Sequence, residues 1–116
     1  MKRQIRPRLR ISLGSDIALG PGKVELLEFL QQTGSITKAA GQMGLSYMRA
    51  WTLIRTMNRC FRQPLVVATR GGSKGGGGAE LTETGRRALE LYQNMNATCL
   101  KSVRPDWNEF QSLLRR

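Results

Sequence analysis

The chain has 116 residues, which is enough for one compact domain and too few for two of ordinary size. Its 19 lysine and arginine residues against 8 aspartate and glutamate residues give a formal net charge of +11, which suits a polyanionic partner. The chain contains no histidine, which excludes an imidazole base and a histidine-ligated metal. No other base is positioned to activate a nucleophile, so we expect neither an enzyme nor a bound cofactor.

The two cysteines and the hydrophobic runs indicate the cellular compartment. Cys60 and Cys99 lie far apart and match no zinc-binding spacing, so we interpret both as reduced thiols and most simply as small core residues. The basic N-terminus lacks the uninterrupted apolar stretch of a signal peptide, and no run approaches the roughly 20 apolar residues of a membrane span. We therefore expect a cytoplasmic, nucleoid-associated protein with no membrane partner.

Near the N-terminus, apolar residues alternate with basic or polar ones. In order, they are Ile5, Arg6, Arg8, Leu9, Arg10, Ile11, Ser12 and Leu13, with a break at Pro7. A period of two predicts a half-buried strand over residues 8–13 with its arginines on the outer face. It is either an edge strand kept soluble by charge or a basic arm that contacts phosphate. Residues 17–19 are expected to be a short apolar lead into the first helix.

A core helix is predicted over residues 21–33. Pro21 suits a first helical turn, where its missing N–H costs nothing. Val24, Leu27 and Leu30 form an apolar stripe at helical spacing, and Gly34 suits the end of the helix. We expect this helix to support the core.

Residues 35–61 have the pattern of a helix-turn-helix. Two helices, over 36–43 and 47–61, would be capped by Ser35 and Ser46 and joined by a turn at Gly44. No acidic residue occurs between positions 29 and 79. The basic residues in that span are Lys38, Arg49, Arg55, Arg59, Arg62, Arg70 and Lys74. This charge distribution predicts that the segment lies against DNA.

A helical wheel divides the second of these helices into two faces. The core face carries Ala50, Leu53, Ile54, Met57 and Phe61, and the opposite face carries Met48, Thr52, Arg55 and Arg59, flanked by Arg49 and Thr56. A face of short polar, apolar and cationic groups without carboxylates suits the major groove of DNA. Trp51 is expected to flank the core, and Tyr47 could either pack or reach a phosphate.

The next segment predicts a hairpin. Residues 65–69 have the β-branched composition of a strand, residues 70–78 form a glycine-rich loop, and residues 79–81 form a return strand. A P-loop requires GxxxxGK[ST] directly before a helix, whereas here Lys74 is followed by Gly75 and a strand intervenes, so nucleotide binding is disfavoured. After a recognition helix, such a hairpin is the wing of a winged-helix domain. Its tip either has no role or lets the backbone approach phosphates.

A long helix is predicted over residues 83–103, with Thr82 as its cap. Its apolar stripe consists of Ala88, Leu89, Tyr92, Met95, Cys99 and Val103. Twenty residues is long for one small core, so we expect a dimer contact, the alternative being that the second half frays. Asp106 and Glu109 have the spacing of a capping box for a short helix over residues 106–115, which would dock on its own domain or on a partner.

Three stretches carry a family resemblance. They are GSITKAAGQMGLSYMRAW (Gly34 to Trp51), the Met57-Asn58 pair, and GGSKGGGGAELTETGRRALELY (Gly71 to Tyr92). On these residues the chain resembles the N-terminal DNA-binding domain of the ModE family of molybdate-responsive transcription regulators, which is related to the LysR-type winged helix. The resemblance implies a mainly α, α+β winged helix-turn-helix that has a long C-terminal dimerisation helix and binds a palindromic operator as a homodimer.

The resemblance and the helical wheel together give the candidate site residues. In the recognition helix they are Ser46, Tyr47, Met48, Arg49, Thr52 and Arg55; for the wing and the DNA backbone they are Lys38, Arg70, Gly72, Ser73, Lys74 and Gly75; for the dimer interface they are Leu89, Tyr92, Met95, Cys99 and Val103. Full-length family members carry molybdate-binding domains after this region, for which 116 residues leave no room, so molybdate is not expected to bind this chain.

We therefore expect a sequence-specific regulator that binds double-stranded DNA as a homodimer. One alternative is a molybdate-binding or storage protein, for which only the family association speaks. The other is a non-specific nucleic-acid-binding module. Aromatic residues make up only 6% of the chain and form no obvious stacking platform, which speaks against this alternative.

Overall fold

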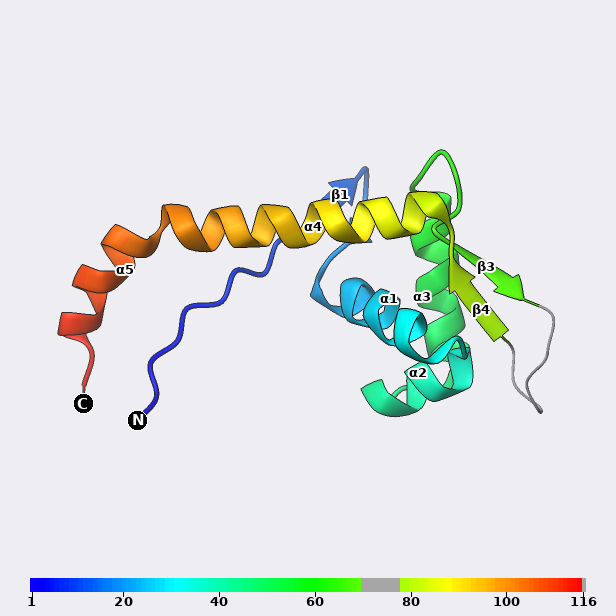
Figure 1. Ribbon diagram of the computed structural model, residues 1–116, viewed down its shortest axis with the longest axis horizontal. Helices are drawn as coiled ribbons and strands as arrows, with labels where there is room; N and C mark the ends of the chain where they lie inside the picture. The colour runs from blue at the N-terminus through cyan, green and yellow to red at the C-terminus, as the bar shows by residue number, and fades with distance from the viewer. Residues whose placement is uncertain (70–77, 116) are drawn as a thin grey trace.

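A packed head and a projecting arm make up the molecule (Figure 1). The computed structural model describes residues 1–69 and 78–115. The elements in chain order are β1 (Ile11–Leu13), β2 (Asp16–Leu19), α1 (Pro21–Thr33), α2 (Ile36–Met43), α3 (Tyr47–Arg59), β3 (Val66–Thr69), β4 (Gly78–Leu81), α4 (Glu83–Ser102), α5 (Arg104–Phe110) and a 3₁₀ turn (Gln111–Leu113). The radius of gyration is 16.8 Å, against about 13 Å for a compact chain of this length. The excess comes from the second half of α4, α5 and the 3₁₀ turn, which together form the arm and extend beyond the other elements.

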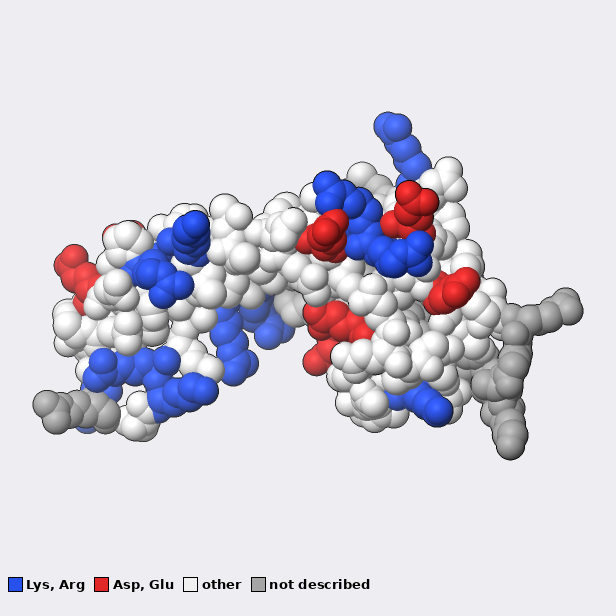
Figure 2. Space-filling model, viewed as in Figure 1, with Lys and Arg blue, Asp and Glu red and all other residues white. Residues whose placement is uncertain are grey.

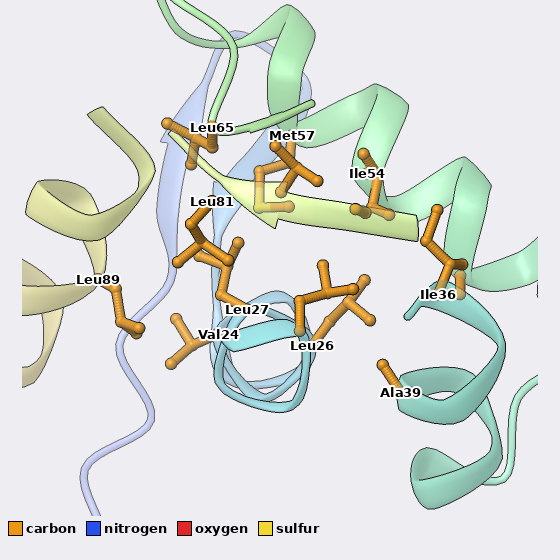
Figure 3. Close-up of a cluster of buried hydrophobic side chains, with 14 of the residues drawn as sticks. Val24, Leu26, Leu27, Ile36, Ala39, Ile54, Met57, Leu65, Leu81 and Leu89 are labelled. Atoms are coloured by element: carbon orange, nitrogen blue, oxygen red, sulfur yellow. The ribbon is translucent and has the colours of Figure 1, made fainter. Parts of the chain in front are cut away.

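The core lies between α1, α3, the β3–β4 hairpin and the first half of α4. Figure 3 shows side chains of α1 pointing toward those of α3 and β4. The fully enclosed members include Leu26, Leu27, Leu30, Ile36, Ala39, Ala50, Ile54, Met57, Leu65, Leu89 and Tyr92. Trp51, Leu53 and Phe61 pack against this cluster while remaining partly exposed. The core face that the helical wheel predicted for α3 is therefore the buried one.

Local signals define the ends of α1, α2 and α3. Ser35 accepts a hydrogen bond from the Lys38 backbone N–H at 3.1 Å, and Ser46 accepts one from the Arg49 N–H at 3.0 Å. Gly34 and Gly44 follow α1 and α2 with φ of 66° and 69°, a left-handed conformation that favours glycine. The two capping serines and the two glycines thus place the three helices within the bounds expected, except that α3 ends at Arg59 rather than residue 61.

An isolated β-bridge joins the helix-turn-helix to the wing. β3 and β4 pair antiparallel from Val66↔Leu81 to Thr69↔Gly78. Ser35 forms an isolated antiparallel bridge with Gly78, and the Ala79 N–H donates to the Gly34 carbonyl at 3.1 Å. The junction between α1 and α2 is therefore hydrogen-bonded to the strand that leaves the wing.

Side chains from α3 and α4 hold the base of the wing. The Asn58 amide donates to the Val66 carbonyl at 3.0 Å, and its oxygen accepts from the Leu65 N–H at 2.9 Å. Thr82 donates through its hydroxyl to the Pro64 carbonyl at 2.7 Å and accepts from the Gly85 N–H at 3.0 Å. A side chain at Gly85 would place its Cβ 2.1 Å from the Leu65 carbonyl oxygen, so only glycine fits there.

The N-terminal region differs from the expectation. The strand is shorter than residues 8–13 and pairs with β2, which the sequence suggested was only an apolar lead. Gly14, with φ of 62°, allows the tight turn between β1 and β2. Burial of Ala18 and Leu19 then anchors the hairpin against the rest of the head.

The C-terminal region also differs. α5 begins at Arg104, with Pro105 inside its first turn, so the proline starts a helix rather than ending one. Its N-cap is Val103, which makes no side-chain capping bond, and the capping box expected of Asp106 and Glu109 is therefore wrong. The last residues of the expected helix form a 3₁₀ turn instead.

Replacement of Gly85 by alanine should destabilise the fold. The added methyl group meets backbone rather than a movable side chain, and overpacking of this kind costs about 1–3 kcal/mol. Urea unfolding followed by circular dichroism measures the change. The matched control is Gly41→Ala in α2, where a Cβ would meet nothing within 4 Å and alanine should stabilise the helix by about 0.5–1 kcal/mol. Equal stabilities for the two variants would contradict this account of the wing base.

Candidate nucleic-acid interface

The outward face of α3 is accessible along its length. Met48 is 65% exposed and Tyr47 is 42% exposed, whereas Ala50, Ile54 and Met57 on the opposite face are fully buried. The remaining candidates in the helix, Ser46, Arg49, Thr52 and Arg55, are also exposed. All six predicted recognition-helix residues therefore lie on a surface that a partner can reach.

Thr52, at the centre of this face, is already hydrogen-bonded in the free protein. Its hydroxyl donates to the Met48 carbonyl one turn earlier, at 2.9 Å. The hydroxyl oxygen can still accept a hydrogen bond, and the methyl group can contact the methyl of thymine. To donate to a base, the Thr52 hydroxyl would first have to give up its hydrogen bond to the Met48 carbonyl.

The cation at the far end of α3 has an internal partner. Arg59 forms an ion pair with Asp16, the first residue of β2, with 3.5 Å between Nη2 and Oδ2. Both side chains are largely exposed, at 63% and 41%, so the pair contributes little to stability. The carboxylate nevertheless offsets positive charge at the C-terminal end of α3. The uncompensated charge on this helix is therefore concentrated toward Arg49 and Arg55.

Lys23, in the first turn of α1, was not identified from the sequence. Burial lowers the pKa of Lys23, Cys60 and Asp16 raise it, and the Arg49 guanidinium lowers it further. Arg49 on α3 and Cys60 at its C-cap thus both act on this amino group, although the buried side chains of α1 serve the core. A helical wheel describes one helix at a time and carries no information on which helices pack together. The sequence alone therefore could not associate Lys23 with the groups on α3.

Lys38 extends the basic surface onto α2. It is exposed in the first turn of that helix, next to the Ser35 cap. Figure 1 shows α2 at one edge of the head, with α3 beginning beside it. The other predicted backbone contacts, Arg70, Gly72, Ser73, Lys74 and Gly75, lie outside the described residues.

The interface predicted on α4 needs correction. Leu89 and Tyr92 are 3% and 2% exposed, because they pack in the core of their own chain. The Tyr92 hydroxyl also donates to the Leu9 carbonyl at 2.7 Å. These two side chains are therefore unavailable to a partner. Met95 and Val103 remain exposed, at 42% and 38%, and Cys99 is half-buried.

An apolar residue on α4 that the sequence analysis passed over is Leu91, which is 42% exposed. It lines a surface hollow with Phe61 and Ala88. Met95 follows it by four residues, so the two lie on one face of the helix.

In the part of the chain that the structure describes, no helix is long and apolar enough to cross a membrane. Within the same residues, no cluster of three or more cysteine, aspartate or glutamate side chains could hold a metal ion.

Comparison with known proteins supports a DNA-binding helix-turn-helix. The family model of the bacterial regulatory helix-turn-helix protein, lysR family, matches residues 22–86, from the start of α1 into α4. Among curated relatives, the molybdenum transport protein ModE of Azotobacter vinelandii is 44% identical over 86 residues, covering 72% of this chain and 32% of that protein. The DNA-binding transcriptional dual regulator ModE of Escherichia coli K12 is 39% identical over 84 residues, with the same coverage. The chain thus spans about a third of the length of these relatives.

Solved structures share the fold at low sequence identity. FabT of Streptococcus pneumoniae, determined in complex with DNA, gives a TM-score of 0.57 at 9% identity, covering 75% of this chain and 61% of that one. The A103V mutant of MepR from Staphylococcus aureus gives 0.54 at 17% identity, covering 82% and 72%. Together with the hairpin that follows α3, they show the winged helix-turn-helix fold. The chain belongs to the lysR family of bacterial regulatory helix-turn-helix proteins, and its DNA-binding domain resembles those of the ModE transcription regulators.

Proposed function

We propose that this protein is a cytoplasmic, sequence-specific transcription regulator that binds a palindromic operator as a homodimer. The observation that carries the proposal is the exposed face of α3, which displays hydrogen-bonding, apolar and cationic groups and lies within the matched family segment. No carboxylate occurs on α2, α3 or the turn between them, so nothing on this surface repels phosphate.

In this proposal α3 enters the major groove by its N-terminal half. Arg49 can donate two hydrogen bonds to guanine, and Met48 and the Thr52 methyl can contact thymine. Lys38 on α2 and Lys23 on α1 supply charge to neighbouring phosphates, which gives affinity without sequence preference. The contacts that specify sequence and those that position the protein thus come from different helices.

The wing is proposed to contact the adjacent backbone. The side-chain hydrogen bonds of Asn58 and Thr82 support this role, since they hold the base of the hairpin against α3 and α4. The sequence between β3 and β4 carries Arg70 and Lys74 among glycines, which permit close approach to phosphate.

Dimerisation is proposed to occur through the outer side of α4 and the arm. An arm that extends from a small head leaves apolar side chains exposed, and a second copy is the simplest way to cover them. Leu91, Met95, Val103 and Phe110 are each 38–53% exposed. A two-fold axis through this region would present two copies of α3 to half-sites about 34 Å apart. The molybdenum-related names of the curated relatives describe those proteins, and we assign DNA, not molybdate, as the ligand of the described residues.

Substitution of the recognition face should change which DNA sequence is preferred. We expect Arg49→Ala and Thr52→Ala each to lose about 1–3 kcal/mol of discrimination at the base pair contacted. Selection of bound fragments from random DNA, followed by competition binding, measures this loss. Arg87→Ala on α4, where the arginine pairs with Glu90, is the control and should leave the preference unaltered. If neither α3 variant changes the preferred sequence, the assigned face is wrong.

Removal of a backbone contact should act on all sequences alike. Lys38→Gln is expected to weaken operator and unrelated DNA equally and to reduce the slope of log K against log salt by about 0.9 for each protomer. Titrations at several salt concentrations give the slope. The same result is expected for Lys74→Gln if the wing contacts phosphate. An unchanged slope would show that the lysine concerned does not touch DNA.

Charge placed on the outer side of α4 should separate the dimer. Leu91→Asp and Met95→Asp each remove an apolar contact worth about 1.5–3 kcal/mol and bury a carboxylate. Sedimentation equilibrium should show a shift to monomer and a loss of affinity for a two-half-site operator. Leu13→Asp, at the 58% exposed end of β1, is the matched control. A wild-type protein that stays monomeric at all concentrations tested would contradict the proposed dimer.

A further inference from the structure

The N-terminal segment, residues 1–10, is a second concentration of positive charge that the helix-turn-helix does not explain. It carries five basic residues and no acidic one: Lys2, Arg3, Arg6, Arg8 and Arg10. Among the described residues, the salt bridges are Arg59–Asp16 and Arg87–Glu90, and neither involves this segment. Arg6 has a hydrogen bond only to the neighbouring Gln4 side chain, at 2.8 Å. Its charges are therefore not compensated within the described part of the chain.

The segment is held in place by its apolar residues. Ile5 and Pro7 line a small hollow with Cys99, Leu100 and Val103 of α4 and its C-cap. Leu9 packs against the core, and its carbonyl accepts the 2.7 Å hydrogen bond from Tyr92. Ile5, Pro7 and Leu9, at alternate positions, thus hold the segment against α4 and the core. A tail that served only solubility would not need these contacts.

This attachment displays the arginines at regular intervals. Pro7 and Leu9 are partly buried, whereas Arg6, Arg8 and Arg10 are exposed. An extended backbone separates alternate residues by at most about 7 Å. Phosphates of one DNA strand also recur at a regular interval of several ångströms, so such a row of cations can follow the backbone. A row of evenly spaced cations fits a polyanion with a regular repeat better than a single small anion.

The N-terminal segment also lies on the same side of the molecule as α2 and the beginning of α3. The shortest dimension is only 24 Å, and Figure 1 views the chain along it. In that view both termini, α2 and the beginning of α3 all lie on the same side of α4. Figure 2 shows basic side chains gathered below the arm at the end where the termini lie. Since the longest dimension is 53 Å, a DNA duplex along this side would meet both α3 and the segment within about one and a half turns.

We propose that residues 1–10 form a second DNA-contacting surface, which binds the sugar–phosphate backbone beside the half-site contacted by α3. The inference rests on the proposed DNA-binding function and adds a contact outside the family-matched segment, which begins at residue 22. In the proposed dimer, each protomer would supply one such segment. The two segments would contribute affinity but no sequence preference.

A charge-matched pair of double variants tests the proposal. Arg6→Gln with Arg8→Gln removes two exposed cations from the segment but keeps its apolar anchors. Arg62→Gln with Arg87→Gln removes the same net charge from exposed positions outside the segment and the recognition face. Thermal unfolding of both proteins should match wild type. Each is then titrated with operator and with unrelated DNA across a range of salt, and its footprint is mapped with hydroxyl radicals.

We expect the segment variant to keep the preferred sequence, to lose protection of backbone positions next to each half-site, and to lower the salt slope by about 1.8 per protomer. The control should retain the full footprint. Equal weakening of the two variants with unchanged footprints would overturn the proposal, because only the long-range field would then matter. It would also be overturned if the segment variant lost binding to anionic vesicles and not to DNA. A wild-type protein without sequence preference would instead refute the proposed function, and the difference in salt slope between the two double variants would still decide the role of the segment.

Discussion

The backbone of Leu65 is the point at which α3, the wing and α4 are joined. Its N–H donates to Asn58 at the end of α3, its carbonyl accepts from the Thr82 N–H at the start of α4, and its side chain is fully buried. Gly85 leaves room for that carbonyl, since any side chain there would collide with it. A loop without regular structure between α3 and β3 would otherwise allow the wing to move independently. Satisfying both polar groups of one buried residue removes that freedom.

Exposed charge is distributed unevenly between the helix-turn-helix and α4. Arg49, Arg55 and Lys38 are exposed on α2 and α3, with Lys23 beside them, while Asp16 balances Arg59 where α3 ends. The first half of α4 carries both signs, as in the pairing of Arg87 with Glu90. Positive potential is therefore directed to one side of the head rather than spread over it. A local cluster of positive charge of this kind favours rapid, oriented encounter with a polyanion.

Local signals explain which parts of the fold could be predicted. Pro21, the capping serines and Gly34 and Gly44 act through neighbouring backbone, so the starts of α1, α2 and α3 follow from sequence alone. The β1–β2 hairpin could not be predicted, because its strands of three and four residues are too short for a clear period. Pro105 suggested the end of a helix but lies in the first turn of α5. Proline is compatible with both positions, so the sequence did not distinguish them. A helical wheel shows that Leu89 and Tyr92 are apolar but not which chain covers them. Lys23 and Asp16 approach α3 only through tertiary packing, so the helical wheel of α3 alone does not reveal them.

The bridge between Ser35 and Gly78 has a consequence for the thermodynamics of association. Because the helix-turn-helix and the base of the wing are hydrogen-bonded to each other before any ligand arrives, little conformational entropy in these elements remains to be lost on binding. The heat-capacity change of complex formation should then reflect the area of surface buried, without the additional term that accompanies coupled folding. Under the proposed function, the same hydrogen-bonded frame would disfavour operators whose groove geometry departs from the preferred one. Such operators must bend toward the protein, so the deformability of the DNA itself becomes part of what is selected.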